Sequence, residues 1–168
     1  FALRPDAHYA EFHERALFNH ILASQDPTDG WACYMVPVGR GVTHEYERNM
    51  TNGGFTCCTG SSMESHALHS HGLYYASGDT LWVNLYAPST ADWTTAGVTL
   101  TMDTDFPEGE SGTLKLTLAS AKEFTLALRR PFWVGTHFAV RVNGDPGAAE
   151  LLAPPRSLLL DGAAVVAL

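Results

Sequence analysis

The spacing of apolar residues changes once along this chain of 168 residues, close to Asp79. Before that point apolar residues recur every three or four positions, which is typical of helices. After it they alternate with other residues, which is typical of strands. A helical part followed by a strand-rich part predicts an α+β chain of two domains, and we place them at residues 1–78 and 79–168.

Two helices are expected in the first part. One runs from Asp6 to about Ser24 and is ended by the Asp26-Pro27 pair. The second is expected over residues 62–76, because Ser61 and Glu64 have the spacing of a capping box. Residues 30–55 between the helices are irregular, apart from a possible short strand at 31–36.

The second part carries five segments in which apolar residues alternate with other residues. They span residues 81–85, 98–102, 114–118, 124–128 and 138–142, and a final strand is expected at 157–160 or 164–168. Turn sequences such as Glu108-Gly109 and Asn143-Gly144 separate the segments. Short alternating strands at these intervals predict an antiparallel β-sandwich or half of one.

Two adjacent cysteines, Cys57 and Cys58, lie just before the expected start of the second helix. Adjacent cysteines form a disulfide only through a strained ring, so two thiolates that bind one soft metal ion are a more natural arrangement. The positive end of a helix would favour the thiolate form. The alternative is a pair of small buried residues, and we interpret the third cysteine, Cys33, in that way.

Composition excludes several classes of partner. The 10 basic and 18 acidic residues give a net charge of −8 without a basic cluster, so nucleic acid and anionic membranes are not expected as partners. Apolar runs are too short for a membrane-spanning helix. The start of the chain lacks an initiator methionine and the features of a signal peptide, so we expect a piece of a longer protein whose compartment the sequence does not indicate.

Three motifs together resemble one family. They are Glu14-Arg-Ala-Leu-Phe-Asn-His, Cys57-Cys-Thr-Gly-Ser-Ser-Met-Glu-Ser-His-Ala and Asp79-Thr-Leu-Trp-Val-Asn-Leu-Tyr-Ala-Pro-Ser. Their order and spacing are similar to the C-terminal part of the bacterial β-L-arabinofuranosidases, glycoside hydrolase family 127 and its relatives. The resemblance implies the last helices of an (α/α)6 barrel followed by a β-sandwich. It also implies release of terminal β-L-arabinofuranosyl groups from plant-type glycans with retention of configuration.

The resemblance assigns roles to three residues. Cys57 would be the nucleophile and a zinc ligand, Cys58 a second zinc ligand, and Glu14 a sugar contact. The family's other two zinc ligands, a glutamate and a cysteine, and its general acid/base glutamate are expected before Phe1. The chain alone is therefore expected to be inactive. It would act on an arabinofuranoside-containing glycan only together with the N-terminal part of the same polypeptide.

Each candidate also has a structural interpretation. Glu14 could instead form an ion pair with Arg15 or Arg4 on its helix. Glu64 fits the capping box better than a role as catalytic acid. For the whole chain, the alternative is a non-catalytic carbohydrate-binding or structural module in which the cysteine pair is inert.

Two further groups of side chains could form sites. The histidines of the second helix are expected to point around it rather than converge on a metal ion. The aromatic residues at the start of the strand-rich part could form a platform for a sugar, although packing between domains is the more usual role. These residues are His66, His69 and His71, and Trp82, Tyr86 and Trp93.

Overall fold

A computed structural model describes residues 1–50, 54–134, 138–144, 158–161 and 165–167. The chain divides into two compact units. One is Phe12–His71, and the other combines Phe1–Glu11 with Gly72–Leu168. The cysteine doublet, helix α2 (Cys57–Ala67) and the second half of helix α1 (Ala7–Ala16) belong to the first unit. The two larger sheets belong to the second, together with the first half of α1 and a 3-10 turn, η4 (Phe132–Val134). The domain ranges 1–78 and 79–168 stay a prediction.

The first predicted helix is confirmed, with three successive helical forms. It comprises α1 (Ala7–Ala16), a π-helical turn η1 (Leu17–Ile21) and a 3-10 turn η2 (Leu22–Ser24). The Asp6 carboxylate caps its start by accepting a hydrogen bond from the His8 backbone N–H at 3.0 Å. The helix ends at Gln25, whose backbone is extended, as the following Asp26-Pro27 pair predicts.

The segment between the helices contains a small hairpin. Strand β1 (Cys33–Met35) pairs antiparallel with β2 (Glu45–Tyr46), and the 3-10 turn η3 (Glu47–Asn49) follows directly. Strand β1 falls within the predicted range 31–36. Arg48 fixes η3 to the loop after the first helix, because its guanidinium lies 2.6 Å from Asp26 and 2.9 Å from Asp29.

The predicted bounds of the second helix are wrong at both ends. Helix α2 runs over Cys57–Ala67, and its N-cap is Thr56, whose side chain accepts a hydrogen bond from the Cys58 N–H. Ser61 lies inside the helix, and its hydroxyl donates to the Cys57 carbonyl at 3.0 Å, so the Ser61–Glu64 capping box does not form. The helix does not reach residue 76, because residues 74–77 form a strand.

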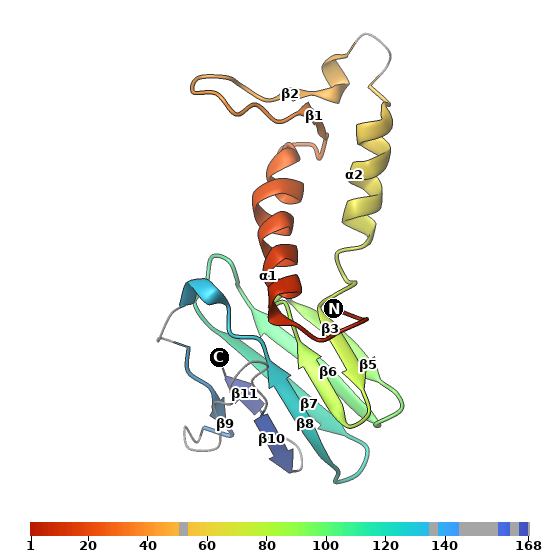
Figure 1. Cartoon of the computed structure of the whole chain (residues 1–168), viewed down its shortest axis with the longest axis vertical. Coiled ribbons are helices and arrows are strands. Elements are labelled where there is room, and N and C mark those ends of the chain that lie inside the picture. Colours follow the sequence, from red (N-terminus) through yellow and green to blue (C-terminus); the bar gives the residue numbers. More distant parts are fainter. Residues whose placement is uncertain (51–53, 135–137, 145–157, 162–164, 168) are drawn as a thin grey trace. The chain divides into compact units, whose positions relative to one another are not determined.

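The second unit contains two larger sheets (Figure 1). In a four-stranded sheet the order is β10-β8-β4-β3, and in a five-stranded sheet it is β5-β6-β7-β11-β9. The strands are β3 (Tyr74–Ser77), β4 (Thr80–Val83), β5 (Ser89–Trp93), β6 (Val98–Thr104), β7 (Gly112–Leu118), β8 (Glu123–Leu128), β9 (Arg141–Val142), β10 (Leu158–Asp161) and β11 (Val165–Ala167).

The pairing of β4 with β8 corrects the prediction of purely antiparallel strands. These two strands run parallel, whereas β3 and β4 form an antiparallel hairpin through Gly78, which has a positive φ of 57°. Every pair in the five-stranded sheet is antiparallel. Parallel neighbours need a long connection, and β5, β6 and β7 of the other sheet supply it between β4 and β8.

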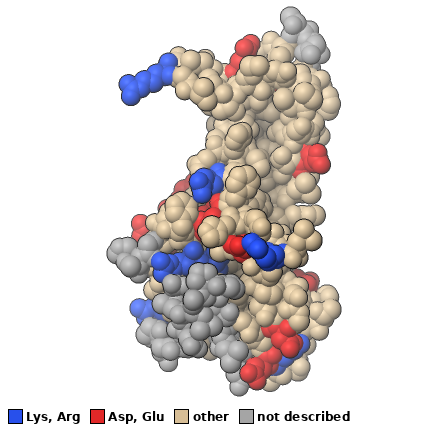
Figure 2. Space-filling model, viewed as in Figure 1, with Lys and Arg blue, Asp and Glu red and all other residues tan. Residues whose placement is uncertain are grey.

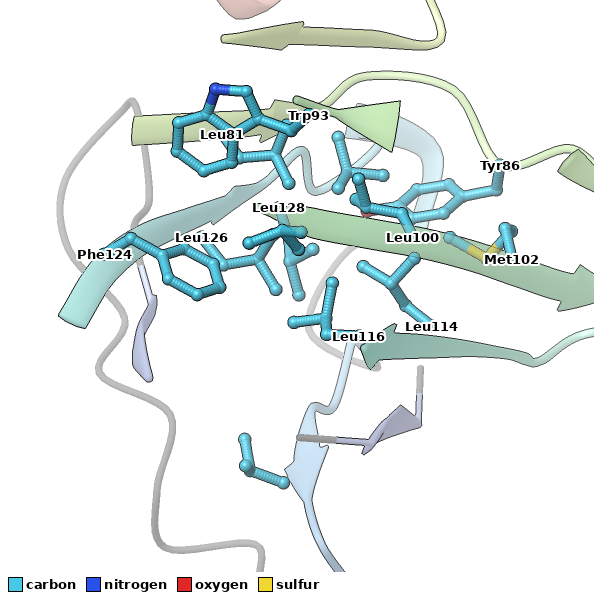
Figure 3. Packing of buried hydrophobic residues seen from close by; sticks show 13 residues of the cluster. Leu81, Tyr86, Trp93, Leu100, Met102, Leu114, Leu116, Phe124, Leu126 and Leu128 are labelled. Carbon is cyan, nitrogen blue, oxygen red and sulfur yellow. The ribbon is translucent and has the colours of Figure 1, made fainter. Parts of the chain in front are cut away.

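Side chains from both sheets form one buried cluster (Figure 3). The alternation predicted for the strands is confirmed in β6, where Val98, Leu100 and Met102 are buried and Thr101 and Asp103 are exposed. The rings of Trp93 and Phe124, one from each sheet, meet edge to face with centroids 5.7 Å apart. The rest of the cluster comprises Leu81, Val83, Tyr86, Leu114, Leu116, Leu126, Leu128 and Val142.

Charged side chains are sparse on the visible surface. On the face in Figure 2, the described lysines and arginines form small separate groups between much larger areas of other residues. No helix within the described ranges is long and apolar enough to cross a bilayer.

Candidate active site at the cysteine doublet

The cysteine doublet lies on the first turn of α2. The Cys57 side chain is exposed, the Cys58 side chain is half-buried, and neither is in a disulfide. Their Sγ atoms are 3.9 Å apart. Two thiolates that each lie about 2.3 Å from a tetrahedral zinc ion are about 3.8 Å from one another. The spacing and the soft donor atoms of the doublet therefore fit two positions of one zinc site.

The doublet alone does not complete such a site. Within the part of the chain that the structure describes, no group of three or more histidine, cysteine, aspartate or glutamate side chains is placed to hold a metal ion. Two thiols fill half of a tetrahedral coordination sphere.

The surroundings of Cys58 oppose ionisation of its thiol. The Thr56 hydroxyl accepts a hydrogen bond from the Cys58 N–H at 3.1 Å. Burial raises the pKa of the Cys58 thiol, and so do its hydrogen bond with Cys57 and the nearby charges of Cys57 and Glu47, while Thr56 acts in the opposite direction. Burial and neighbouring charges thus outweigh any effect of the helix start on the pKa of Cys58.

Glu47 is a site residue that the sequence did not indicate. Its side chain is fully buried, and its carboxylate contacts hydroxyls on both sides of the doublet. The Thr56 hydroxyl donates to Oε1 at 2.5 Å, and the Thr59 hydroxyl donates to Oε2. Glu45 and Glu47 look alike in the sequence, and only the fold shows that Glu45 is exposed whereas Glu47 is enclosed.

Glu14 lies on α1 with 5% of its surface exposed. It belongs to the same compact unit as the doublet, and α2 packs against η1, the turn that follows α1. Of the two predicted ion-pair partners, Arg4 pairs instead with Asp6 at 3.1 Å. The sugar-binding role of Glu14 stays a prediction.

Two other residues have roles within the local structure. Cys33 is buried in β1, and its thiol donates to the Met35 carbonyl at 2.8 Å, in keeping with its interpretation as an ordinary buried cysteine. Glu64 is exposed on α2, and its carbonyl accepts the N–H of Leu68 at the helix end. Its predicted capping role is wrong because Thr56, and not Ser61, is the N-cap.

Of the three histidines, only His66 lies on α2, because the helix ends at Ala67 before His69 and His71. Nδ1 of His66 lies 2.8 Å from Nε2 of His69, and the two rings are nearly perpendicular. Burial lowers the pKa of His69, and the charges of His66 and His13 lower it further. The two rings contact each other in the turn that follows α2, where the His69 N–H donates to the His66 carbonyl at 3.4 Å. His71 is exposed.

The three aromatic residues do not form a shared platform, which was the less usual of the two interpretations. Trp93 and Tyr86 are buried in the core, whereas Trp82 is half-buried with the Phe1 ring against its edge at 6.2 Å. Tyr86 instead lines a cavity of about 490 Å³ in the second unit. The rings of Phe106 and Trp133 stack beside this cavity with centroids 5.7 Å apart.

A helical unit with a zinc-compatible cysteine doublet, followed by a unit of two sheets, is the arrangement expected of a glycoside hydrolase of the resembled family. The model of the GH127 β-L-arabinofuranosidase catalytic domain matches residues 1–71, and the model of the GH127 middle domain matches residues 80–152. The chain therefore belongs to the β-L-arabinofuranosidase family GH127. A search of curated protein sequences gave no match.

Solved structures of related enzymes share the fold. A GH127 β-L-arabinofuranosidase from Geobacillus stearothermophilus T6 is 22% identical, with a TM-score of 0.75 over 98% of this chain and 28% of that one. A second GH127 β-arabinofuranosidase is 22% identical, with a TM-score of 0.77 over 96% and 28% of the two chains. A further glycoside hydrolase is 22% identical, with a TM-score of 0.74 over 96% of this chain and 29% of that one. The chain thus spans less than a third of each of these proteins.

Proposed function

We propose that the complete protein is a retaining glycoside hydrolase that releases terminal β-L-arabinofuranosyl groups from plant-type glycans. The observation that carries the proposal is the 3.9 Å separation of the Cys57 and Cys58 sulfurs on the first turn of α2, in a chain of family GH127. In the complete protein the helices would close an (α/α)6 barrel, and the two sheets would form a β-sandwich domain.

Cys57 and Cys58 would hold a zinc ion together with a glutamate and a cysteine from elsewhere in the protein. When bound, zinc supplies the positive charge that keeps a thiol deprotonated and oriented near neutral pH. Cys57 is the better nucleophile of the two because its side chain is exposed, whereas Cys58 is half-buried.

Hydrolysis would take place in two displacements at the anomeric carbon. The Cys57 thiolate forms a C–S bond as the C–O bond to the aglycone breaks, and a carboxylic acid outside this chain protonates the leaving oxygen. That carboxylate then takes a proton from water, the water oxygen bonds to the anomeric carbon, and Cys57 leaves as thiolate. Two inversions give net retention of configuration.

Glu14 would bind the sugar. A carboxylate accepts charge-assisted hydrogen bonds from the hydroxyls of a furanose ring, and such bonds orient a ligand well. Glu14 belongs to the same compact unit as the doublet. The isolated chain is expected to show no turnover, because two cysteines cannot fill a tetrahedral zinc site.

Hydrolysis of an aryl β-L-arabinofuranoside by the complete protein tests the proposal. Cys57→Ser should lower kcat by at least about a thousandfold with the fold intact, because the nucleophile is lost. Cys33→Ala is the matched control and should retain near-normal activity, because its thiol bonds within β1. Near-normal turnover by Cys57→Ser would refute the role of Cys57. A wild-type protein that binds arabinofuranosides without cleaving them would favour the alternative of a non-catalytic carbohydrate-binding module.

A further inference from the structure

Glu47 is a carboxylate with no exposed surface, although it lies in a short turn between β2 and α2. Burial of a charged group is costly unless hydrogen bonds compensate for the lost water. The compensation here comes from two hydroxyls, because Thr56 donates to one carboxylate oxygen at 2.5 Å and Thr59 donates to the other. Both oxygens of Glu47 are therefore engaged by α2 and its cap.

The two threonines that carry these hydroxyls flank the cysteine doublet in the sequence. Thr56 precedes Cys57, and Thr59 follows Cys58. Thr56 also accepts the Cys58 N–H at 3.1 Å. A hydroxyl can donate one hydrogen bond while it accepts others, so Thr56 can cap the helix and still donate its proton to a separate acceptor. Glu47 is that acceptor.

The position of Glu47 is fixed by residues outside α2. Its backbone N–H donates to the Ala32 carbonyl at 3.0 Å, and its own carbonyl accepts the Met50 N–H at 3.0 Å. Gly54 approaches so closely that a Cβ there would lie 3.0 Å from the Glu47 carbonyl oxygen. The backbone of Glu47 is thus held by Ala32, Met50 and Gly54, and its carboxylate reaches the start of α2 from outside the helix.

We propose that Glu47 is a positioning residue for the Cys57–Cys58 doublet. Its carboxylate accepts hydrogen bonds from Thr56, before the doublet, and from Thr59, after it. These bonds fix the first turn of α2 so that both sulfurs can bind one metal ion. The inference rests on the proposed function, because the orientation of the doublet matters only if the sulfurs bind zinc. Residues that orient metal ligands in this way commonly change metal affinity by about 10- to 100-fold when replaced.

Two substitutions separate this role from simple space filling. Glu47→Gln keeps the shape but leaves one acceptor oxygen, so one of the two threonine hydroxyls loses its acceptor. Thr59→Val keeps the volume of residue 59 and removes only its hydroxyl. Glu45→Gln is the matched control, because Glu45 is two residues away and exposed on β2.

The zinc affinity of the complete protein, measured by competition with a chelator, is the direct test. Glu47→Gln and Thr59→Val should each weaken zinc binding about 10- to 100-fold. The double variant should be within about threefold of the weaker single variant, because both substitutions break the same contact. Glu45→Gln should bind zinc within about twofold of wild type. In turnover assays, kcat should fall for both site variants while KM changes little.

Zinc affinity within about twofold of wild type in both Glu47→Gln and Thr59→Val would overturn the inference. Thr59→Val alone carries the test if Glu47→Gln does not fold, as judged by circular dichroism. A wild-type protein that binds zinc but cleaves no arabinofuranoside would refute the proposed function, while the variants would still decide the role of Glu47. Wild-type protein that binds no zinc would overturn both.

Discussion

Glu11 and Arg129 form a buried ion pair although they are far apart in the sequence. Oε1 of Glu11 lies 2.6 Å from Nη1 of Arg129, and the two side chains are 12% and 2% exposed. Arg129 also donates through Nε to the Asn84 carbonyl. The pair joins the segment matched by the catalytic-domain model to the segment matched by the middle-domain model.

Arg129→Ala should destabilise the protein by about 3–5 kcal/mol, because it leaves the Glu11 carboxylate buried without its cation. The matched control is Arg4→Ala, which removes an ion pair to Asp6 whose arginine is 72% exposed and should cost at most about 1 kcal/mol. Urea denaturation of both variants measures the difference. An equal loss of unfolding free energy in the two variants would show that the buried Glu11–Arg129 pair stabilises the protein no more than the exposed Arg4–Asp6 pair.

Metal removal should expose the doublet to thiol reagents. Zinc-bound thiolates react slowly, so chelation of the complete protein should release two additional thiols, those of Cys57 and Cys58, in a titration with an aromatic disulfide under native conditions. The Cys57→Ser/Cys58→Ser double variant should show no such release. If chelation increased the number of reactive thiols equally in the double variant, the metal ion would be bound at other cysteines.

Gly54→Ala should disturb the site more than an equivalent change at Gly78. Both glycines have a positive φ, 74° and 57°, which costs a non-glycine residue about 1 kcal/mol or more. A Cβ at Gly54 would also lie 3.0 Å from the Glu47 carbonyl oxygen and from the Trp31 ring, whereas a Cβ at Gly78 meets nothing within 4 Å. Thermal unfolding and zinc content should both be affected in Gly54→Ala. A zinc content equal to that of Gly78→Ala would argue against a coupling between this loop and the doublet.

The stability of the loop after the first helix should depend on pH through Asp26. A hydrogen bond from the Thr28 N–H and then the Arg48 guanidinium hold the pKa of Asp26 below its ordinary value. The unfolded chain therefore binds the proton more tightly, so this stabilisation is present above about pH 4 and is lost as pH falls through the lowered pKa.

Asp26→Asn is the variant that reveals this contribution. Its unfolding temperature should lie below that of wild type at pH 7, and the gap should narrow as pH falls below about 4. Melting curves recorded between pH 7 and pH 3 measure the gap. A gap that stays constant over this range would show that Asp26 does not contribute through its charge.

The strands that the sequence predicted best are those with a clear difference between their two faces. Strands β6 and β7 bury alternate aliphatic residues, and β8 buries Phe124, Leu126 and Leu128 at the same spacing, so periodicity alone identified them. Strand β5 (Ser89–Trp93) was missed because it is mostly polar and buries only Trp93 completely. The parallel pairing of β4 with β8 was also not predictable, since local alternation carries no information about which strands become neighbours.

The start of α2 was mispredicted because two local signals compete. Thr56 and Ser61 are both good N-cap residues, and Ser61 has the better capping-box partner in Glu64. The choice is made by Glu47, which engages Thr56 and Thr59 from a different segment. Sequence indicated that the doublet lies at a helix start, but the carboxylate that sets this start depends on the fold of residues 31–54.

The identity of the nucleophile tests the central claim most directly. The complete protein is incubated with an arabinofuranose analogue that carries an epoxide at the anomeric position, digested, and analysed by peptide mass spectrometry. The account predicts one adduct, on Sγ of Cys57, and loss of that adduct in Cys57→Ser. An adduct on Cys58 or on a carboxylate instead, with Cys57 unmodified, would contradict it.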